Sequence, residues 1–156
     1  MLYRLRQRAG DEGGFTLIEL LVVILIIGIL AGIAIPAFLA QKNKAVSASA
    51  KSMVASAETA AETYSTDNNG SFAGLSTAVV NEYEHTIPTT EQTTEGKPWL
   101  SAAHEEEGGS GYIVTVSVKV GGTTATFSAT RNANGEIAKS CTPKNPTDGC
   151  PKSGEW

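Results

Sequence analysis

The chain contains few of the residues from which catalytic or metal sites are built. Its 156 residues include two cysteines, two histidines and 6% aromatic residues. A structural zinc site takes four ligands, and His85 and His104 lie at no spacing typical of such a set. No nucleophile, general base and orienting group can be assembled from the sequence. We therefore expect a structural protein rather than an enzyme, with no cofactor and no metal.

Charge is missing altogether from Leu20 to Gln41. A membrane-spanning helix needs about 20 apolar residues, and Leu20 to Ala40 supplies 21 uncharged ones. A secretory signal peptide is the alternative, but its apolar region is usually about 7–15 residues long and precedes a small-residue cleavage site. This run is longer and continues into a helical pattern. We expect a retained membrane span.

The charges that flank this run predict how the chain is oriented. Three arginines lie within the first eight residues, and positive residues stay on the cytoplasmic side. Lys42 and Lys44 on the far side weaken the asymmetry without reversing it. The body from residue 41 onward is therefore expected outside the cytoplasmic membrane. It holds nine Lys and Arg against thirteen Asp and Glu, which makes it a poor binder of nucleic-acid phosphates.

The two cysteines, Cys141 and Cys150, both lie near the C-terminal end of this body. Two cysteines in an exported domain usually form a disulfide. Free thiols are the alternative.

The spacing of apolar residues predicts one long helix from residue 15 to about 66. Beyond the uncharged run, apolar and small residues recur at intervals of three and four, as on one face of an amphipathic helix. Alanine is frequent among them and favours helix. These positions are Val46, Ala50, Met53, Val54, Ala57, Ala60, Ala61 and Tyr64. Asn and Gly at residues 68–70 can take the left-handed conformation that closes a helix.

A small antiparallel sheet is expected at about 111–141, giving an α+β fold with the helix packed on the sheet. Residues 111–120 alternate with valines on one face, and Gly121-Gly122 is a two-residue hairpin signal. The expected pairs are Val120 with Thr123, Val118 with Ala125, Val116 with Phe127 and Val114 with Ala129. A third strand is expected at 136–141. Residues 71–110 are predicted to be mostly loop, with a short helix near 76–83.

The segment Gly14-Phe15-Thr16-Leu17-Ile18-Glu19, followed by a long apolar run with Pro36, resembles the class III signal of type IV pilins and pseudopilins. The resemblance implies that a prepilin peptidase removes residues 1–14 and that Phe15, the new N-terminus, is N-methylated. Residues 15–40 would form a transmembrane and filament-core helix. Residues 41–156 would form an extracytoplasmic head. Identical subunits would leave the bilayer through a membrane assembly platform and join a helical filament.

Glu19 is the one acid at the head of the apolar run. A charge at the bilayer centre costs roughly 2.5–3.5 kcal/mol on insertion scales, and an ionisable residue in such a span is by default a candidate for a functional role. The resemblance implies that Glu19 recognises the Phe15 amine of a neighbouring subunit during assembly. An interfacial acid without a partner is the alternative.

Gly28, Gly32 and Pro36 recur every four residues. Proline cannot donate to the carbonyl four residues earlier and crowds it, and the Gly-x-x-x-Gly spacing permits close helix approach. We predict a segment that kinks or melts in a packed filament. Ordinary variation is the alternative, because Gly and Pro are common in membrane spans.

Three functions remain open. The first is a type IV pilin, anchored in the cytoplasmic membrane and then assembled into a surface filament for adhesion, twitching motility or DNA uptake. The Cys141–Cys150 pair resembles the disulfide-bounded loop of many pilins. The second is a pseudopilin of a type II secretion system; Lys97-Pro98-Trp99-Leu100 lacks the glycine of its usual Pro-Trp-Gly element, and no Asp cluster for calcium follows. The third is a bitopic membrane enzyme or sensor.

Overall fold

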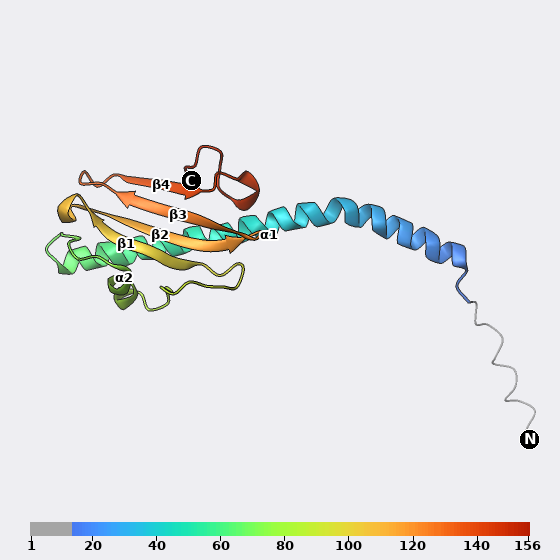
Figure 1. Ribbon diagram of the computed structural model, residues 1–156, viewed down its shortest axis with the longest axis horizontal. Coiled ribbons are helices and arrows are strands. Elements are labelled where there is room, and N and C mark those ends of the chain that lie inside the picture. Colours follow the sequence, from blue (N-terminus) through green and yellow to red (C-terminus); the bar gives the residue numbers. More distant parts are fainter. Residues whose placement is uncertain (1–13) are drawn as a thin grey trace, which may run out of the picture. The chain divides into compact units, whose positions relative to one another are not determined.

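The computed structural model describes residues 14–156 (Figure 1). Two compact units make up the chain, Met1–Phe38 and Leu39–Trp156. Apart from Gly14, the predicted leader lies outside the described residues, as do the arginines on which the expected orientation rests. The elements in chain order are α1 (Leu17–Asp67), α2 (Thr77–Tyr83), β1 (Trp99–Glu106), the 3-10 turn η1 (Glu107–Gly109), β2 (Gly111–Val120), β3 (Thr123–Arg131), β4 (Ile137–Thr142) and the 3-10 turn η2 (Pro146–Asp148).

The described part of the first unit is a short coil followed by the N-terminal part of α1. Its large apolar side chains are all exposed, with exposed fractions between 46% at Val22 and 88% at Phe15. Among the described residues, α1 is the one helix long and apolar enough to cross a membrane. A helix that is apolar all round requires an apolar environment, which is consistent with the expected membrane span.

The helix α1 ends where the sequence predicts. Asn69 and Gly70 follow it with φ of 56° and 83°, and the Gly70 amide donates to the Ser65 carbonyl at 2.8 Å. This six-to-one bond satisfies a carbonyl that the last turn leaves without a helical partner. The predicted helix of residues 15 to about 66 is therefore confirmed to within two residues at its ends.

In the second unit, a stripe of small residues on α1 packs against the sheet. The predicted stripe is confirmed, because its members belong to the core or border it. Ala50, Ala57 and Ala61 are fully buried. Since alanine has only one side-chain carbon, these positions leave room for the larger side chains of the strands. The facing side chains are Tyr112, Val114, Val116, Val118 and Val120 of β2, with Ala125, Phe127 and Ala129 of β3.

The sheet is an antiparallel meander of order β1-β2-β3-β4. Every predicted pair of the β2–β3 hairpin is present. Gly121 and Gly122 have φ of 57° and 81°, the positive values that a two-residue hairpin turn requires. The expected third strand is β4. The predicted α+β fold is confirmed.

The prediction for residues 71–110 was partly wrong. The short helix α2 lies where it was expected, but β1 occupies Trp99–Glu106, so the sheet has four strands and starts at residue 99. Only Trp99 and Leu100 of β1 are buried, and its pairing shifts register between Leu100 and Ala102. Alanine and glutamate disfavour strands, and an exposed edge strand lacks the apolar alternation by which a strand is recognised.

Candidate functional site

The start of α1 carries the residues for which processing and assembly roles were predicted. Gly14 and Phe15 precede the helix and are exposed. A Cβ atom added at Gly14 would meet nothing within 4 Å. Exposed, non-helical backbone is where proteolysis occurs most readily. Cleavage after Gly14 and N-methylation of Phe15 stay predictions.

Glu19 forms a capping box with Thr16. The Thr16 amide and the Thr16 hydroxyl donate to Glu19 Oε2 at 2.9 and 2.8 Å, and the Glu19 amide donates to Thr16 Oγ1 at 3.2 Å. Two amides that the first helical turn leaves without partners are thereby satisfied. Glu19 thus has a local structural role that was not foreseen. The Thr-x-x-Glu spacing is the sequence signal that would have identified Thr16.

Gly28, Gly32 and Pro36 all lie within α1, which continues through Pro36. Cβ atoms added at Gly28 and Gly32 would meet nothing within 4 Å. Gly28 lies in a shallow apolar hollow with Leu21 and Ile24. These positions offer a smooth surface for close packing of another helix. Melting or kinking in a filament stays a prediction.

The two cysteines form a disulfide, with Cα atoms 5.7 Å apart. The segment that it closes, residues 141–150, contains a cis peptide bond between Thr142 and Pro143. Buried Asp148 anchors this segment to α1. Asn43 Nδ2 donates to Asp148 Oδ1 at 2.9 Å, and the Ser47 hydroxyl donates to the Asp148 carbonyl.

The anchoring of this segment to α1 was not predicted, because the partners lie far apart in the sequence. Asn145 Nδ2 also donates to Asp148 Oδ2, at 2.6 Å, so both carboxylate oxygens are occupied. Gly149 follows with a φ of 82°, and a Cβ atom there would lie 2.6 Å from Ser47 Cβ. The segment is therefore fitted closely against α1 rather than held by the disulfide alone.

The two histidines do not come together with acids into a recognisable site. His104 lies on the edge strand β1 and His85 in the loop after α2, and both are exposed. Within the part of the chain that the structure describes, no group of three or more His, Cys, Asp or Glu side chains is arranged to hold a metal.

Two comparisons with known protein sequences cover the start of α1 and a longer part of the chain. The prokaryotic N-terminal methylation motif matches residues 11–35. The type II secretion system core protein G of Escherichia coli (strain K12) is 35% identical over 109 residues, covering 65% of this chain and 64% of that protein.

Further relatives match over shorter stretches. The core protein G of Pectobacterium carotovorum subsp. carotovorum is 45% identical over 63 residues, covering 40% of each chain. That of Aeromonas hydrophila is 43% identical over 58 residues, covering 37% of this chain and 41% of its own. The chain spans less than two thirds of the length of each of these relatives. No solved structure matches at a comparable level of significance.

Proposed function

We propose that this chain, which carries a prepilin-type N-terminal signal and is homologous to type II secretion system core protein G, acts as a pseudopilin. The observation that carries the proposal is the similarity over 109 residues, which extends well beyond the 25 residues of the methylation motif. This favours the second of the functions left open by the sequence over the first. The role is structural: the subunit would polymerise into a short filament within the cell envelope, and no reaction is assigned to it.

The predicted processing and membrane-anchoring residues then act in one sequence of events. A prepilin peptidase cleaves after Gly14 and leaves a free amine on Phe15. The subunit waits in the cytoplasmic membrane, anchored by the first part of α1. It then enters a filament of identical subunits through a membrane assembly platform.

Capping and assembly are compatible roles for Glu19. Both hydrogen bonds from Thr16 go to Oε2, which leaves Oε1 to accept from the Phe15 amine of a neighbouring subunit. A carboxylate at a helix N-terminus also complements the helix dipole. The capping box would hold the carboxylate at the helix start before that neighbour arrives.

The experiment is mass spectrometry of cell fractions from the native host. A processed N-terminal peptide that begins at methylated Phe15, retained in the envelope and absent from sheared surface material, is the expected result. Deletion of the gene should reduce secretion of exported proteins. Protein that keeps residues 1–14 in the native host would refute the proposal and favour a bitopic membrane protein of another function.

A type IV pilin is the second candidate, and one observation favours it. The disulfide closes a C-terminal segment that resembles the disulfide-bounded loop of many pilins. On this alternative, methylated Phe15 would dominate the sheared surface fraction, and the deletion would impair adhesion, twitching motility or DNA uptake instead of secretion.

A further inference from the structure

An open hollow lies at the start of the second unit, where the disulfide-bounded segment and the residues after it pack against α1. Its volume is about 450 Å³. Lys44 and Lys51 line it from α1, and Lys152 lines it from the C-terminal segment. We call this feature the basic hollow, because no carboxylate is among the described residues that line it. Its remaining lining residues are Ser47, Ala48, Pro146, Gly149 and Pro151.

The three lysines meet here for two structural reasons. Lys44 and Lys51 are seven residues apart, which places them on one face of α1, two turns from each other. The anchoring of the disulfide-bounded segment to α1 then brings Lys152 to the same place. The carboxylate of Asp148 lies in that segment, but both of its oxygens accept hydrogen bonds from asparagine amides, and Asp148 does not line the hollow.

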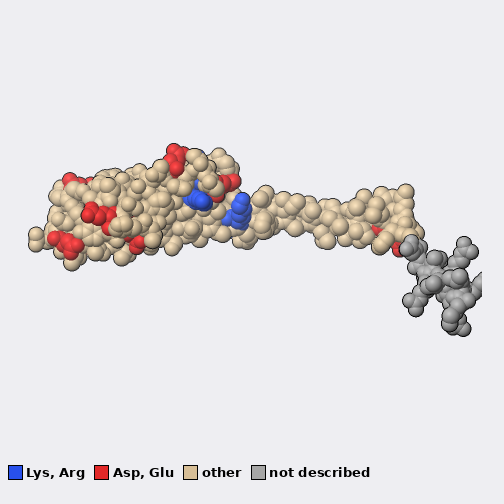
Figure 2. Space-filling view, turned by 90° about the horizontal axis from the view of Figure 1, so that it is seen from below, with Lys and Arg blue, Asp and Glu red and all other residues tan. Residues whose placement is uncertain are grey.

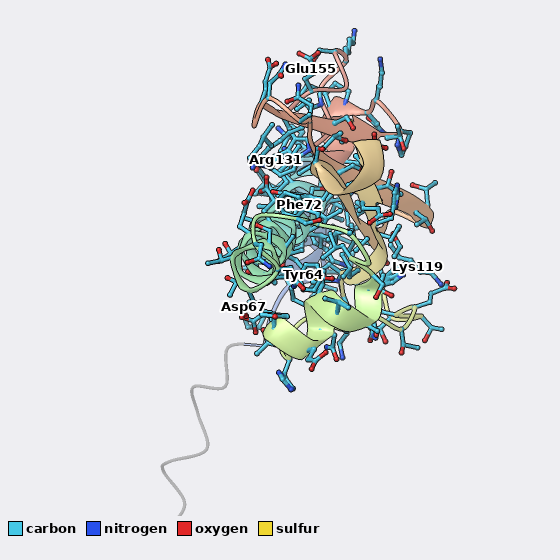
Figure 3. All side chains as sticks on the ribbon, turned by 90° about the vertical axis from the view of Figure 1, so that its left-hand side faces the viewer. Tyr64, Asp67, Phe72, Lys119, Arg131 and Glu155 are labelled. Carbon is cyan, nitrogen blue, oxygen red and sulfur yellow. A yellow bond between two sulfur atoms is a disulfide. The ribbon has the colours of Figure 1, made fainter. Side chains whose placement is uncertain are left out.

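The charges of the basic hollow are not balanced within the chain. Across the part of the chain that the structure describes, none of its three lysines has an ion-pair partner. Cations elsewhere on the unit differ. Lys119, Arg131 and Lys139 each have a carboxylate oxygen within 3.2 Å, and the Arg131 guanidinium also lies over the ring of Phe72 (Figure 3). Three unpaired like charges around one hollow repel one another, so an anion bound there would be stabilised.

Lys51 is the most enclosed of the three lysines. It is half-buried, and its Nζ atom lies 5.2 Å from the ring centroid of Trp156 and 5.5 Å from that of Phe127. Burial lowers the pKa of Lys51 below its usual value, because the ammonium has lost part of its hydration. The rings attract a cation but carry no charge of their own. The positive charge of Lys51 therefore still acts on the hollow.

The basic hollow begins close to the end of the predicted membrane span. Lys44 follows Ala40, the last residue of the predicted span, by four residues. At a rise of 1.5 Å per residue this is about 6 Å along α1, and the headgroup layer of one leaflet is about 5–8 Å thick. Lys44 is therefore expected at the level of the lipid phosphates. On the face that Figure 2 displays, Lys and Arg atoms gather at one end of the second unit, while Asp and Glu atoms are spread along it.

We propose that the basic hollow binds the headgroup phosphate of an anionic phospholipid in the outer leaflet of the cytoplasmic membrane. The inference rests on the proposed function, since it requires a subunit that waits in that membrane with its second unit outside. A lysine ammonium carries three donors and no acceptor, so Lys44 and Lys152 can bond the phosphate oxygens from two sides. Lys51 adds positive charge beside them.

The rest of the lining favours a lipid over a free phosphate ion. Ala48, Pro146 and Pro151 give the basic hollow apolar surface next to its charges, and the glycerol part of a phospholipid can pack on such surface. Basic residues next to a membrane span are attracted to anionic lipids. A bound headgroup would hold the second unit at a fixed depth on the membrane. It would be released when the span leaves the bilayer.

The first experiment is native mass spectrometry of the full-length chain in detergent micelles with added lipid. Phosphatidylglycerol has a net negative charge, whereas phosphatidylcholine carries the same phosphate beside a cation. We expect phosphatidylglycerol to be retained at least about tenfold better than phosphatidylcholine, and inorganic phosphate at the same concentration to leave it bound. Equal retention of the two lipids would overturn the inference. So would displacement by inorganic phosphate, which would show that the free ion is the ligand.

Neutral variants provide the second experiment. Lys44→Gln with Lys152→Gln should weaken the binding of phosphatidylglycerol by about twentyfold, since each lysine near a membrane surface contributes roughly fivefold. Lys97→Gln with Lys144→Gln is the matched control, because both residues are exposed and neither lines the hollow. Its affinity should stay within about twofold of the wild type. Equal losses in the two pairs would attribute the binding to net charge alone and overturn the inference.

A charge-preserving pair separates lipid binding from a folding defect. Lys44→Arg with Lys152→Arg keeps both positive charges, and arginine binds phosphate well. This variant should bind phosphatidylglycerol within about threefold of the wild type. Loss of binding in the arginine pair, at an unchanged unfolding temperature, would contradict a phosphate site in the hollow.

Failure of this inference can be told apart from failure of the proposed function. Lipid binding in micelles requires neither cleavage after Gly14 nor secretion. A chain that is processed and supports secretion, but shows no preference for phosphatidylglycerol, would refute the inference alone. A chain that keeps residues 1–14 in the native host would refute the proposed function, whatever lipid it binds.

Discussion

The Asn43 amide lies 2.9 Å from the Asp148 carboxylate, although 105 residues separate them in the chain. This bond joins the disulfide-bounded segment to α1 close to the start of the second unit.

Asp148→Ala should therefore destabilise the second unit. The change removes the acceptor for Asn43 and Asn145, and leaving donors unsatisfied in a buried site costs about 1–3 kcal/mol. Urea unfolding of the full chain in detergent would measure the loss. Glu155→Ala removes the same charge from an exposed position and is expected to change the free energy of unfolding by less than about 0.5 kcal/mol. Equal effects of the two substitutions would show that Asp148 is not an anchor.

Gly149→Ala should destabilise more than Gly122→Ala. Both glycines have positive φ, 82° and 81°, but a Cβ atom at Gly149 would lie 2.6 Å from Ser47 Cβ, whereas one at Gly122 would meet nothing within 4 Å. Backbone strain alone costs roughly 1–3 kcal/mol at such positions, so Gly122→Ala measures that component. The additional loss of unfolding free energy in Gly149→Ala, compared with Gly122→Ala, measures how closely the segment fits against α1. No excess would argue against that fit.

Thr16→Val should fray the start of α1. It removes the hydroxyl that accepts from the Glu19 amide, and loss of an N-cap costs about 0.5–2 kcal/mol. Amide hydrogen exchange in detergent micelles should become faster for the first helical turn only. Thr16→Ser retains the hydroxyl and should exchange at nearly the wild-type rate. Unchanged exchange in Thr16→Val would show that the Thr16 hydroxyl does not cap the start of α1.

Alkaline pH should weaken the contact between α2 and the end of α1. The Tyr83 hydroxyl donates to Asp67 Oδ2 at 2.9 Å. This bond raises the pKa of Tyr83 above its usual value, and the negative charges of Asp67 and Glu82 add to the effect.

The sign of the pH dependence follows from this raised pKa. The neutral tyrosine is favoured in the folded state, so its stabilisation is complete below the unfolded pKa of about 10 and is lost as pH rises through the folded pKa. Phenolate absorbance should show Tyr83 titrating at lower pH in Asp67→Asn than in the wild type. Identical titration curves would contradict the assignment.

The sequence predicts best those parts of the fold that local pattern determines. The β2–β3 register followed from alternating valines and a Gly-Gly turn, because a shift of one residue would turn every valine away from the core. The strand β1 has no such pattern, since only Trp99 and Leu100 are buried and the rest lies at an exposed edge. Its place in the sheet depends on pairing with β2, which is a tertiary contact.

The same distinction applies to the candidate sites. Glu19 was identified from its position in an apolar run, and its capping partner Thr16 lies within the same local pattern. Asp148 gave no sequence signal, because its partners come from α1.

The anchoring of residues 141–150 to α1 also determines how mechanical tension passes through the second unit. A pull along α1 reaches Asp148 through Asn43 and Ser47. It then crosses the disulfide from Cys150 to Cys141 and enters β4 directly. The disulfide links the two cysteines directly, so the force does not pass through residues 142–149. After reduction of the disulfide, a pull on α1 would first extend these residues before it reached the strands.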